Sequence, residues 1–261
     1  MEILEFGNKE KPKIILIHGF QSIWQIWEKY IDYYKEDYHL IVPIMEGHNP
    51  DKMEEFKSFN DSASFLENWY INNYGDEVYA IFGMSMGGIL ATTILKNNKL
   101  RIKKIILDGS PLASCNWLLK FILRKFYLDI THKTQKRNPK AIENARNFLF
   151  PSNREKEFLS LIDQMDDKII IRFINAISDY KLSNNLDIKN TKIYYYHGDK
   201  LNEMLSKKTA RYLKKTYPSI KITCFKGTSH CEGLSMNYDN CIKILNEILK
   251  EGVKDGSKSD R

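Results

Sequence analysis

The sequence predicts an α/β fold: a mostly parallel, doubly wound sheet with an all-helical segment inserted before its last strands. Three observations support this prediction. Short apolar runs alternate with segments of helical periodicity up to residue 110, only helical patterns follow from 111 to 190, and the alternation then resumes. Strands that alternate with helices form βαβ units, whose right-handed crossovers place helices on both faces of a parallel sheet.

The first half supplies the elements of that alternation. The run at 13–17 is apolar and rich in β-branched residues, which is typical of a buried strand. A helix is expected next, with Ser22 as its N-cap and apolar residues at helical spacing up to Tyr34. The elements expected after it are a strand at 38–45, a helix at 61–74, a strand at 77–82, a helix at 86–98 and a strand at 102–110.

The second half begins with the helical segment. Helical patterns occupy 116–130, 139–150, 154–165 and 168–180, and they are followed by a strand at 191–199, a helix at 206–218, a strand at 220–225 and a helix at 237–250. The predicted organisation is therefore an α/β core of residues 1–110 and 191–250, a helical cap insert of residues 111–190, and a disordered charged tail of residues 251–261.

The first helix of the insert carries an apolar stripe with a basic back. Trp117, Leu118, Phe121, Ile122 and Phe126 recur at helical spacing, and Lys125 lies among them. Such a stripe ordinarily packs a helix onto its neighbours, and we expect it to pack the insert onto the sheet. Two alternatives remain: part of the stripe lines a pocket for an acyl group, or it contacts anionic lipid.

Composition excludes several function classes. Lysine and arginine number 40 against 33 acidic residues, and the resulting charge of +7 is spread along the chain without a dense basic block, so no nucleic-acid partner is expected. The four cysteines form no C-x-x-C pair, which is typical of a reduced, cytoplasmic protein without a metal site. No apolar run approaches the roughly 20 residues of a membrane span, so stable membrane insertion is not expected.

A G-x-S-x-G pentapeptide follows the third buried strand. It runs from Gly83 to Gly87 with Ser85 at its centre, and a helical pattern begins directly after it. In a strand–turn–helix context this motif holds the serine in a strained turn, and small residues two before and two after it avoid backbone clashes. A hydroxyl held at the carboxyl end of the sheet in this way is a candidate nucleophile.

A serine nucleophile needs a base and an oxyanion site. His230 stands in a glycine-bearing loop after the last predicted strand, from which it can reach the serine, whereas the rival His197 ends a strand. The His18-Gly19 turn follows the first buried strand and presents the Phe20 N–H group. Together with the Met86 N–H group after the nucleophile, it is expected to bind an oxyanion.

With these motifs the chain resembles α/β-hydrolases of the serine-hydrolase type. "HGF" is similar to the family's oxyanion turn, "GMSMGG" to its nucleophile elbow and "GTSHCEG" to its histidine loop. "PIMEGHNPD" matches only partly a loop usually written D-x-P-G-H-G-x-S. The resemblance covers residues 3–249 and implies the triad order serine, acid, histidine, no cofactor, and a helical insert at the usual position of the cap.

The sequence departs from the family pattern at the acidic residue of the triad. The family's acid usually stands three residues beyond a glycine in the loop after the strand that follows the cap, and here that position is Leu201. Some members place it after the preceding strand, where this chain has Asp108. The sequence favours Asp108, with Asp199 as the alternative, and leaves Glu203 or no acid at all as further choices.

The function expected from these residues is hydrolysis of a carboxylic ester of a small, lipophilic substrate through an acyl-enzyme. A thioester, amide or peptide bond is the next choice of substrate. Two alternatives keep the fold: a peptidase or carbon–carbon hydrolase, and a hydrolase fold without catalysis that binds a small molecule or a partner. The scaffold alone does not separate them, because it supports many chemistries. The sequence specifies no oligomeric state.

Overall fold

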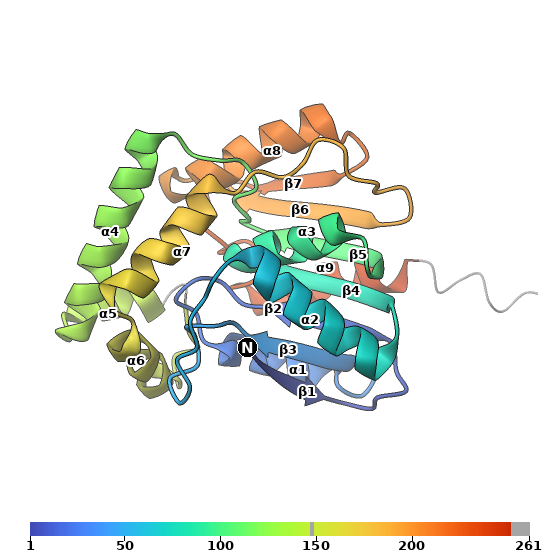
Figure 1. The fold of residues 1–261 in the computed structure, drawn as a ribbon, viewed down its shortest axis with the longest axis horizontal. Helices are drawn as coiled ribbons and strands as arrows, with labels where there is room; N and C mark the ends of the chain where they lie inside the picture. Colours follow the sequence, from blue (N-terminus) through green and yellow to red (C-terminus); the bar gives the residue numbers. More distant parts are fainter. Residues whose placement is uncertain (147–148, 252–261) are drawn as a thin grey trace, which may run out of the picture.

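The computed structural model describes residues 1–146 and 149–251, which form a mostly parallel sheet of seven strands flanked by helices (Figure 1). The strand order is β1-β3-β2-β4-β5-β6-β7. The strands are β1 (Glu2–Phe6), β2 (Lys13–Ile17), β3 (His39–Ile44), β4 (Glu77–Met84), β5 (Arg101–Asp108), β6 (Lys192–Gly198) and β7 (Lys221–Phe225). Only β1 runs antiparallel to its neighbour, β3, and every other pairing is parallel.

Helices cover both faces of the sheet. Their bounds are η1 (Trp24–Trp27), α1 (Glu28–Tyr34), α2 (Phe59–Tyr74), α3 (Met86–Asn97), α4 (Trp117–Gln135), α5 (Pro139–Arg146), α6 (Glu155–Gln164), α7 (Asp167–Asp179), η2 (Leu201–Glu203), α8 (Met204–Thr216) and α9 (Tyr238–Lys250). One apolar cluster buries α1 and α9 against the sheet, and a second buries α2, α3 and α8 against the other face. The predicted doubly wound arrangement is thereby confirmed.

Parallel pairing brings the carboxyl ends of the central strands together. Met84 at the end of β4 pairs with Asp108 at the end of β5, and Asp108 pairs with Tyr196 in β6. The helices α4 to α7 follow one another between β5 and β6, and Figure 1 shows them gathered beyond this same end of the sheet. The loops that carry the candidate chemistry therefore meet at the end of the sheet where the inserted helices lie.

Several local expectations are corrected. Strand β1 was not anticipated. Ser22 does not cap a helix, because its hydroxyl donates to the Leu149 carbonyl at 2.9 Å, and the helix begins later, with a 3₁₀ turn at Trp24. Residues 252–261 of the predicted tail lie outside the described residues, and Glu251, its first residue, accepts a hydrogen bond from the Tyr194 hydroxyl at 2.7 Å.

The apolar stripe of α4 does not pack onto the sheet, so that interpretation is wrong. Its large side chains are exposed, and Trp117 is 79% exposed. The opposite side of the helix makes the internal contacts: the Thr131 hydroxyl accepts from Gln21 Nε2 at 2.7 Å, and Tyr127 packs edge-on against Phe20. Across the described ranges, no helix is both long and apolar enough to cross a bilayer.

Candidate active site

Ser85 occupies the turn between β4 and α3 with an unusual backbone conformation. Its φ of 51° and ψ of −115° lie in a region that residues other than glycine rarely adopt. The turn is held by two backbone hydrogen bonds: Ser85 N–H donates to the Asp108 carbonyl at 2.7 Å, and Gly88 N–H donates to the Ser85 carbonyl at 3.1 Å. The side chain is thereby raised above the carboxyl ends of the strands.

The glycines on either side are required by close backbone contacts. A Cβ atom added to Gly83 would lie 2.6 Å from the Gly88 nitrogen. One added to Gly87 would collide with the Ile17 carbonyl oxygen at the end of β2. Backbone atoms cannot move aside as a flexible side chain can, so only glycine fits at these two positions.

His230 contacts the serine from the loop after β7. Its Nε2 atom lies 2.9 Å from Ser85 Oγ. The ring packs closely on Gly109, where an added Cβ would lie 2.7 Å from the imidazole Cε1. The imidazole is 32% exposed, whereas Glu203 behind it is fully buried. This geometry is that of a hydroxyl with a base in hydrogen-bond reach.

The second ring nitrogen faces Glu203. His230 Nδ1 lies 3.3 Å from Glu203 Oε2, and the other carboxylate oxygen accepts from the N–H groups of Gly198 at 3.1 Å and Cys231 at 3.4 Å. The Glu203 side chain is fully buried at the end of η2. The carboxylate is therefore fixed by backbone donors while it faces the imidazole.

Electrostatics couples these two groups. Burial acts to raise the pKa of Glu203, but the hydrogen bond and charge of His230, with further donors, lower the pKa to about 2. Burial acts in the opposite sense on His230, but the hydrogen bond and charge of Glu203 raise the pKa of the imidazole above its ordinary value. Each partner thus stabilises the charged form of the other.

Asp108 and Asp199, the acids that the sequence favoured, have other partners. Asp108 Oδ2 accepts from the Ser235 N–H group at 2.8 Å and from its hydroxyl at 2.6 Å, and burial raises the pKa of this carboxyl to about 6. Asp199 Oδ1 accepts from the Gly227 N–H group at 2.7 Å. Within residues 1–146 and 149–251, neither carboxylate hydrogen-bonds His230, and the carboxylate that faces the imidazole is that of Glu203.

The turn at the end of β2 is held by two buried histidines. His18 Nε2 accepts from the Met45 N–H group at 3.1 Å, and its Nδ1 lies 2.9 Å from the Gly19 carbonyl. His48 Nε2 accepts from the Gln21 N–H group at 3.0 Å. Burial lowers the pKa of His18 to about 4, so its ring stays neutral and keeps its acceptor nitrogen at neutral pH. No role of His48 in this turn was predicted from the sequence.

Two backbone N–H groups remain for an oxyanion. In the part of the chain that the structure describes, the Phe20 N–H group donates to no protein acceptor. The Met86 N–H group belongs to the first turn of α3, where amides lack an intrahelical acceptor. Both residues are buried, and their loops flank Ser85. No group of three or more potential metal ligands occurs among the described residues.

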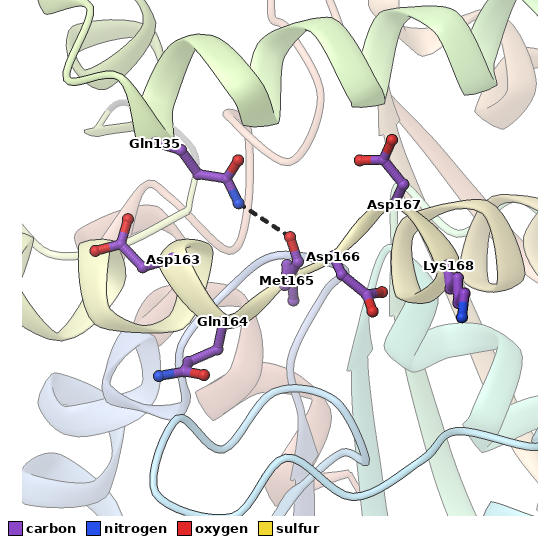
Figure 2. Close-up of a pocket in the computed structure, with 7 residues that line it drawn as sticks. All are labelled: Gln135, Asp163, Gln164, Met165, Asp166, Asp167 and Lys168. Carbon is purple, nitrogen blue, oxygen red and sulfur yellow. Dashed lines mark hydrogen bonds between the residues drawn. The ribbon is translucent and has the colours of Figure 1, made fainter.

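A hollow of about 480 Å³ lies elsewhere, in the helical segment (Figure 2). Gln135 Nε2 donates to the Met165 carbonyl at 3.0 Å across it. Its lining consists of Gln135, Asp163, Gln164, Met165, Asp166, Asp167 and Lys168. None of these residues contacts Ser85, His230 or Glu203 through a hydrogen bond in the described ranges, so the hollow is separate from the site.

The sequence favoured Asp108 and left Glu203 only as a further choice for the acid, because the family's usual offset points two residues earlier, to Leu201. The 3₁₀ turn η2 explains the difference, because Leu201 is 85% exposed while Glu203 turns inward. No signal in the sequence separates Glu203 from Asp199, since both carboxylates lie between β6 and α8.

Comparisons with known proteins agree with this architecture. The α/β hydrolase fold family matches residues 12–150. The chain is 24% identical over 254 residues to a pimeloyl-[acyl-carrier protein] methyl ester esterase from Legionella pneumophila, covering 91% of this chain and 95% of that protein. It is 25% identical over 122 residues to epoxide hydrolase 4 of Mus musculus, covering 45% of this chain and 33% of that protein.

Solved structures resemble the whole chain. An α/β hydrolase family protein from Desulfitobacterium hafniense superimposes with a TM-score of 0.75 at 22% identity, covering 95% of this chain and all of that one. A carboxylesterase from Nitrososphaera gargenis gives a TM-score of 0.75 at 14% identity, covering 95% of this chain and 93% of the other. Likeness at these identities establishes the fold. Since the family matches more than half of the sequence and the strands, elbow and loops follow its architecture, the chain belongs to the α/β-hydrolase fold family.

Proposed function

We propose that this protein is a serine esterase that cleaves small carboxylic esters through an acyl-enzyme. The observation that carries the proposal is the unbroken series of contacts from Ser85 Oγ through His230 to the buried Glu203 carboxylate. A nucleophile, a base and a group that orients the base are the three roles that acyl transfer requires. The strained backbone at Ser85 supports the same role, because such strain persists where a function depends on it.

In the proposed reaction, His230 Nε2 takes the proton of Ser85 Oγ while the oxygen attacks the ester carbonyl. The carbonyl oxygen becomes negative and is bound by the Phe20 and Met86 N–H groups. Collapse breaks the bond to the alcohol oxygen, which leaves with the proton from His230. Water then loses a proton to His230 and attacks the acyl-enzyme, and release of the acid returns the proton to Ser85. Throughout, Glu203 stabilises the imidazolium and holds Nδ1 protonated.

The helices α4 to α7 are proposed to act as a cap that supports the oxyanion turn. The Phe20 ring packs against Tyr127 of α4 at 5.3 Å and against Phe173 of α7 at 5.2 Å, measured between ring centroids. Movement of these helices would therefore displace the residue whose N–H group binds the oxyanion. The Legionella relatives are named as esterases of the methyl ester of pimeloyl-[acyl-carrier protein]. A carboxylic ester of an acyl group is the substrate class we propose.

A reducing, cytoplasmic location is proposed as well. All four cysteines are free thiols, and Cys231 and Cys241 are buried. Free thiols persist where glutathione and thioredoxin keep them reduced.

A fluorophosphonate probe tests the serine directly. We expect the parent protein to be labelled and the Ser85→Ala variant to take no label, because the probe forms its bond with an activated serine oxygen. His230→Ala should label at least tenfold more slowly, and Glu203→Gln should also slow, since the base loses its orienting partner.

Asp108→Asn is the matched control, because Asp108 is a neighbouring buried carboxylate that contacts Ser235. It should label at nearly the parent rate. Folded parent protein that takes no label would refute the esterase proposal and favour a hydrolase fold that only binds. Slowing by Asp108→Asn with full labelling of Glu203→Gln would return the role of the acid to Asp108.

A further inference from the structure

Helix α4 presents an apolar surface to solvent, which we call the α4 stripe. Five of its side chains are large, apolar and exposed: Trp117 (79%), Leu118 (49%), Phe121 (46%), Ile122 (51%) and Phe126 (57%). Elsewhere in the described chain, large exposed apolar side chains are few and scattered, apart from Leu201 and Met204. Apolar exposure gathered on one helix marks an interaction surface more strongly than the same residues spread singly over a protein.

The stripe is not the packing face of the helix. Internal contacts of α4 come from the other side, where Arg124 Nε donates to Asn175 Oδ1 of α7 at 2.7 Å and Thr131 contacts Gln21. Leu123, Tyr127 and Leu128 of that side pack against the buried apolar cluster. The stripe is therefore free while the helix is already anchored, so its exposure does not depend on α4 moving.

A hydrogen bond links the start of α4 to α8. Lys208 of α8 donates to the Ser114 carbonyl just before α4 begins. Leu201 and Met204, on either side of Glu203 in sequence, are exposed apolar residues at the start of this α8 segment. The start of α8 is therefore held close to the start of α4.

The basic side chains of α4 indicate which kind of partner covers the α4 stripe. Between residues 117 and 128, α4 carries Lys120, Arg124 and Lys125 and has no acidic residue. Lys120 is paired with Asp179, but the Lys125 ammonium lies over the Phe121 ring, 4.7 Å from its centroid, with no carboxylate partner in the described chain. Tryptophan, phenylalanine and leucine beside basic side chains on an anchored helix are the composition of helices that lie in a membrane interface.

We propose that the α4 stripe docks this protein peripherally on an anionic phospholipid surface. Trp117, Phe121 and Ile122 enter the boundary between headgroups and acyl chains, and Lys125 contacts the anionic headgroups. The proposal concerns binding alone, and it goes beyond the proposed esterase activity. It is tested with the Ser85→Ala variant, so failure of docking and failure of catalysis give different results.

The experiment is sedimentation of Ser85→Ala protein with sucrose-loaded vesicles. Vesicles of phosphatidylcholine mixed with phosphatidylglycerol are expected to carry the protein down, and pure phosphatidylcholine vesicles should bind it at least about tenfold more weakly. Emission of Trp117 should shift to shorter wavelength on binding, because its indole leaves water. The shift should vanish in Trp117→Phe, which keeps an apolar ring at this position and should still sediment.

Matched variants separate the stripe from general effects. Phe121→Ser combined with Ile122→Ser should weaken sedimentation about tenfold or more, since two apolar side chains no longer leave water. Phe65→Ser is the control, because Phe65 is equally exposed (45%) but lies on α2. Lys125→Glu should weaken binding to anionic vesicles, whereas Lys57→Glu, at an exposed loop position away from α4, should not.

Three results would overturn the proposal. The first is that the protein does not sediment with anionic vesicles. The second is a lack of specificity, seen either as equal binding to both vesicle types or as an equal loss of binding in the Phe65 variant and the Phe121/Ile122 variant. The third is a stable dimer in light scattering that Phe121→Ser/Ile122→Ser converts to a monomer, because a second copy would then be the occupant of the stripe.

Discussion

Glu203 combines complete burial with a strongly acidic carboxyl. Its pKa of about 2 results from the hydrogen bond and charge of His230 and from backbone donors, which outweigh burial. In return Glu203 raises the pKa of His230. As the proposed catalytic base, His230 accepts a proton only when its imidazole is neutral, so activity should fall as the pH drops below this raised pKa.

Glu203→Gln is expected to change both the rate and its pH dependence. Loss of the carboxylate should lower kcat/KM by roughly 10²–10⁴-fold, because the imidazolium formed during attack is no longer stabilised. The pKa of His230 should fall at the same time, so the acidic limb of the kcat/KM profile should move to lower pH. A profile that loses amplitude without moving would contradict a direct contact between the two groups.

The contrast between His230 and Glu203 shows what a single sequence can reveal. His230 follows from its loop after the last strand, because chain order alone brings such a loop to the carboxyl ends of the strands. Glu203 depends on how a few residues after β6 turn, and a 3₁₀ turn there is not encoded by any distinctive pattern. Asp108 ends its strand at the expected place, but its side chain contacts Ser235. Strand topology is predictable here, whereas side-chain direction in the loops is not.

At the scale of elements, close backbone contacts constrain the junction of β2, β4 and α3. Gly87, in the first turn of α3, lies against the Ile17 carbonyl of β2 without room for a Cβ atom. The position of Ser85 therefore depends on how closely α3 approaches the sheet.

Gly87→Ala is expected to abolish probe labelling and to lower the free energy of unfolding, because the helix must move away from the sheet to admit the methyl group. Lys96→Ala is the control, since it also places alanine in α3 but at an exposed position away from the sheet. Labelling and thermal unfolding measured on both variants would test this. Full labelling of Gly87→Ala would show that the elbow tolerates a wider spacing.

Most elements were predictable because their hydrophobic patterns are strong. β2 matches its predicted bounds, and α3 and α9 deviate by about a residue. β1 was missed because its five residues alternate burial only weakly, with a pattern from exposed to half-buried at the edge of the sheet. The α4 stripe was wrongly predicted to pack onto the sheet although its pattern is strong. Apolar spacing identifies a helix but does not say which neighbour, if any, covers its apolar side.

Across the whole molecule, the inserted helices share the hydrophobic core of the sheet. The same buried cluster contains Ile81 of β4, Ile89 of α3 and Phe173 of α7. Phe173 stacks on Phe56 with ring centroids 4.0 Å apart and contacts His48 at 5.0 Å. Because one buried apolar cluster includes residues of both the α/β core and the inserted helices, we expect core and insert to unfold together.

Phe173→Ala should therefore destabilise the entire protein by about 3–5 kcal/mol, the usual cost of removing a buried phenylalanine. Far-ultraviolet circular dichroism and tryptophan fluorescence should report one coincident transition in the parent and in the variant. Phe126→Ala on the exposed α4 stripe is the control and should change stability by less than about 1 kcal/mol. Separate transitions would mean that the insert is an independent folding unit.

The strained backbone at Ser85 has a consequence for engineering. A conformation with φ of 51° and ψ of −115° costs a serine about 1–3 kcal/mol, whereas glycine adopts it with little penalty. A laboratory evolution campaign that scores heat resistance alone would therefore reward the loss of the proposed nucleophile, and Ser85→Gly is an early substitution it would enrich. Thermostable descendants of this enzyme should be selected with turnover as a second criterion.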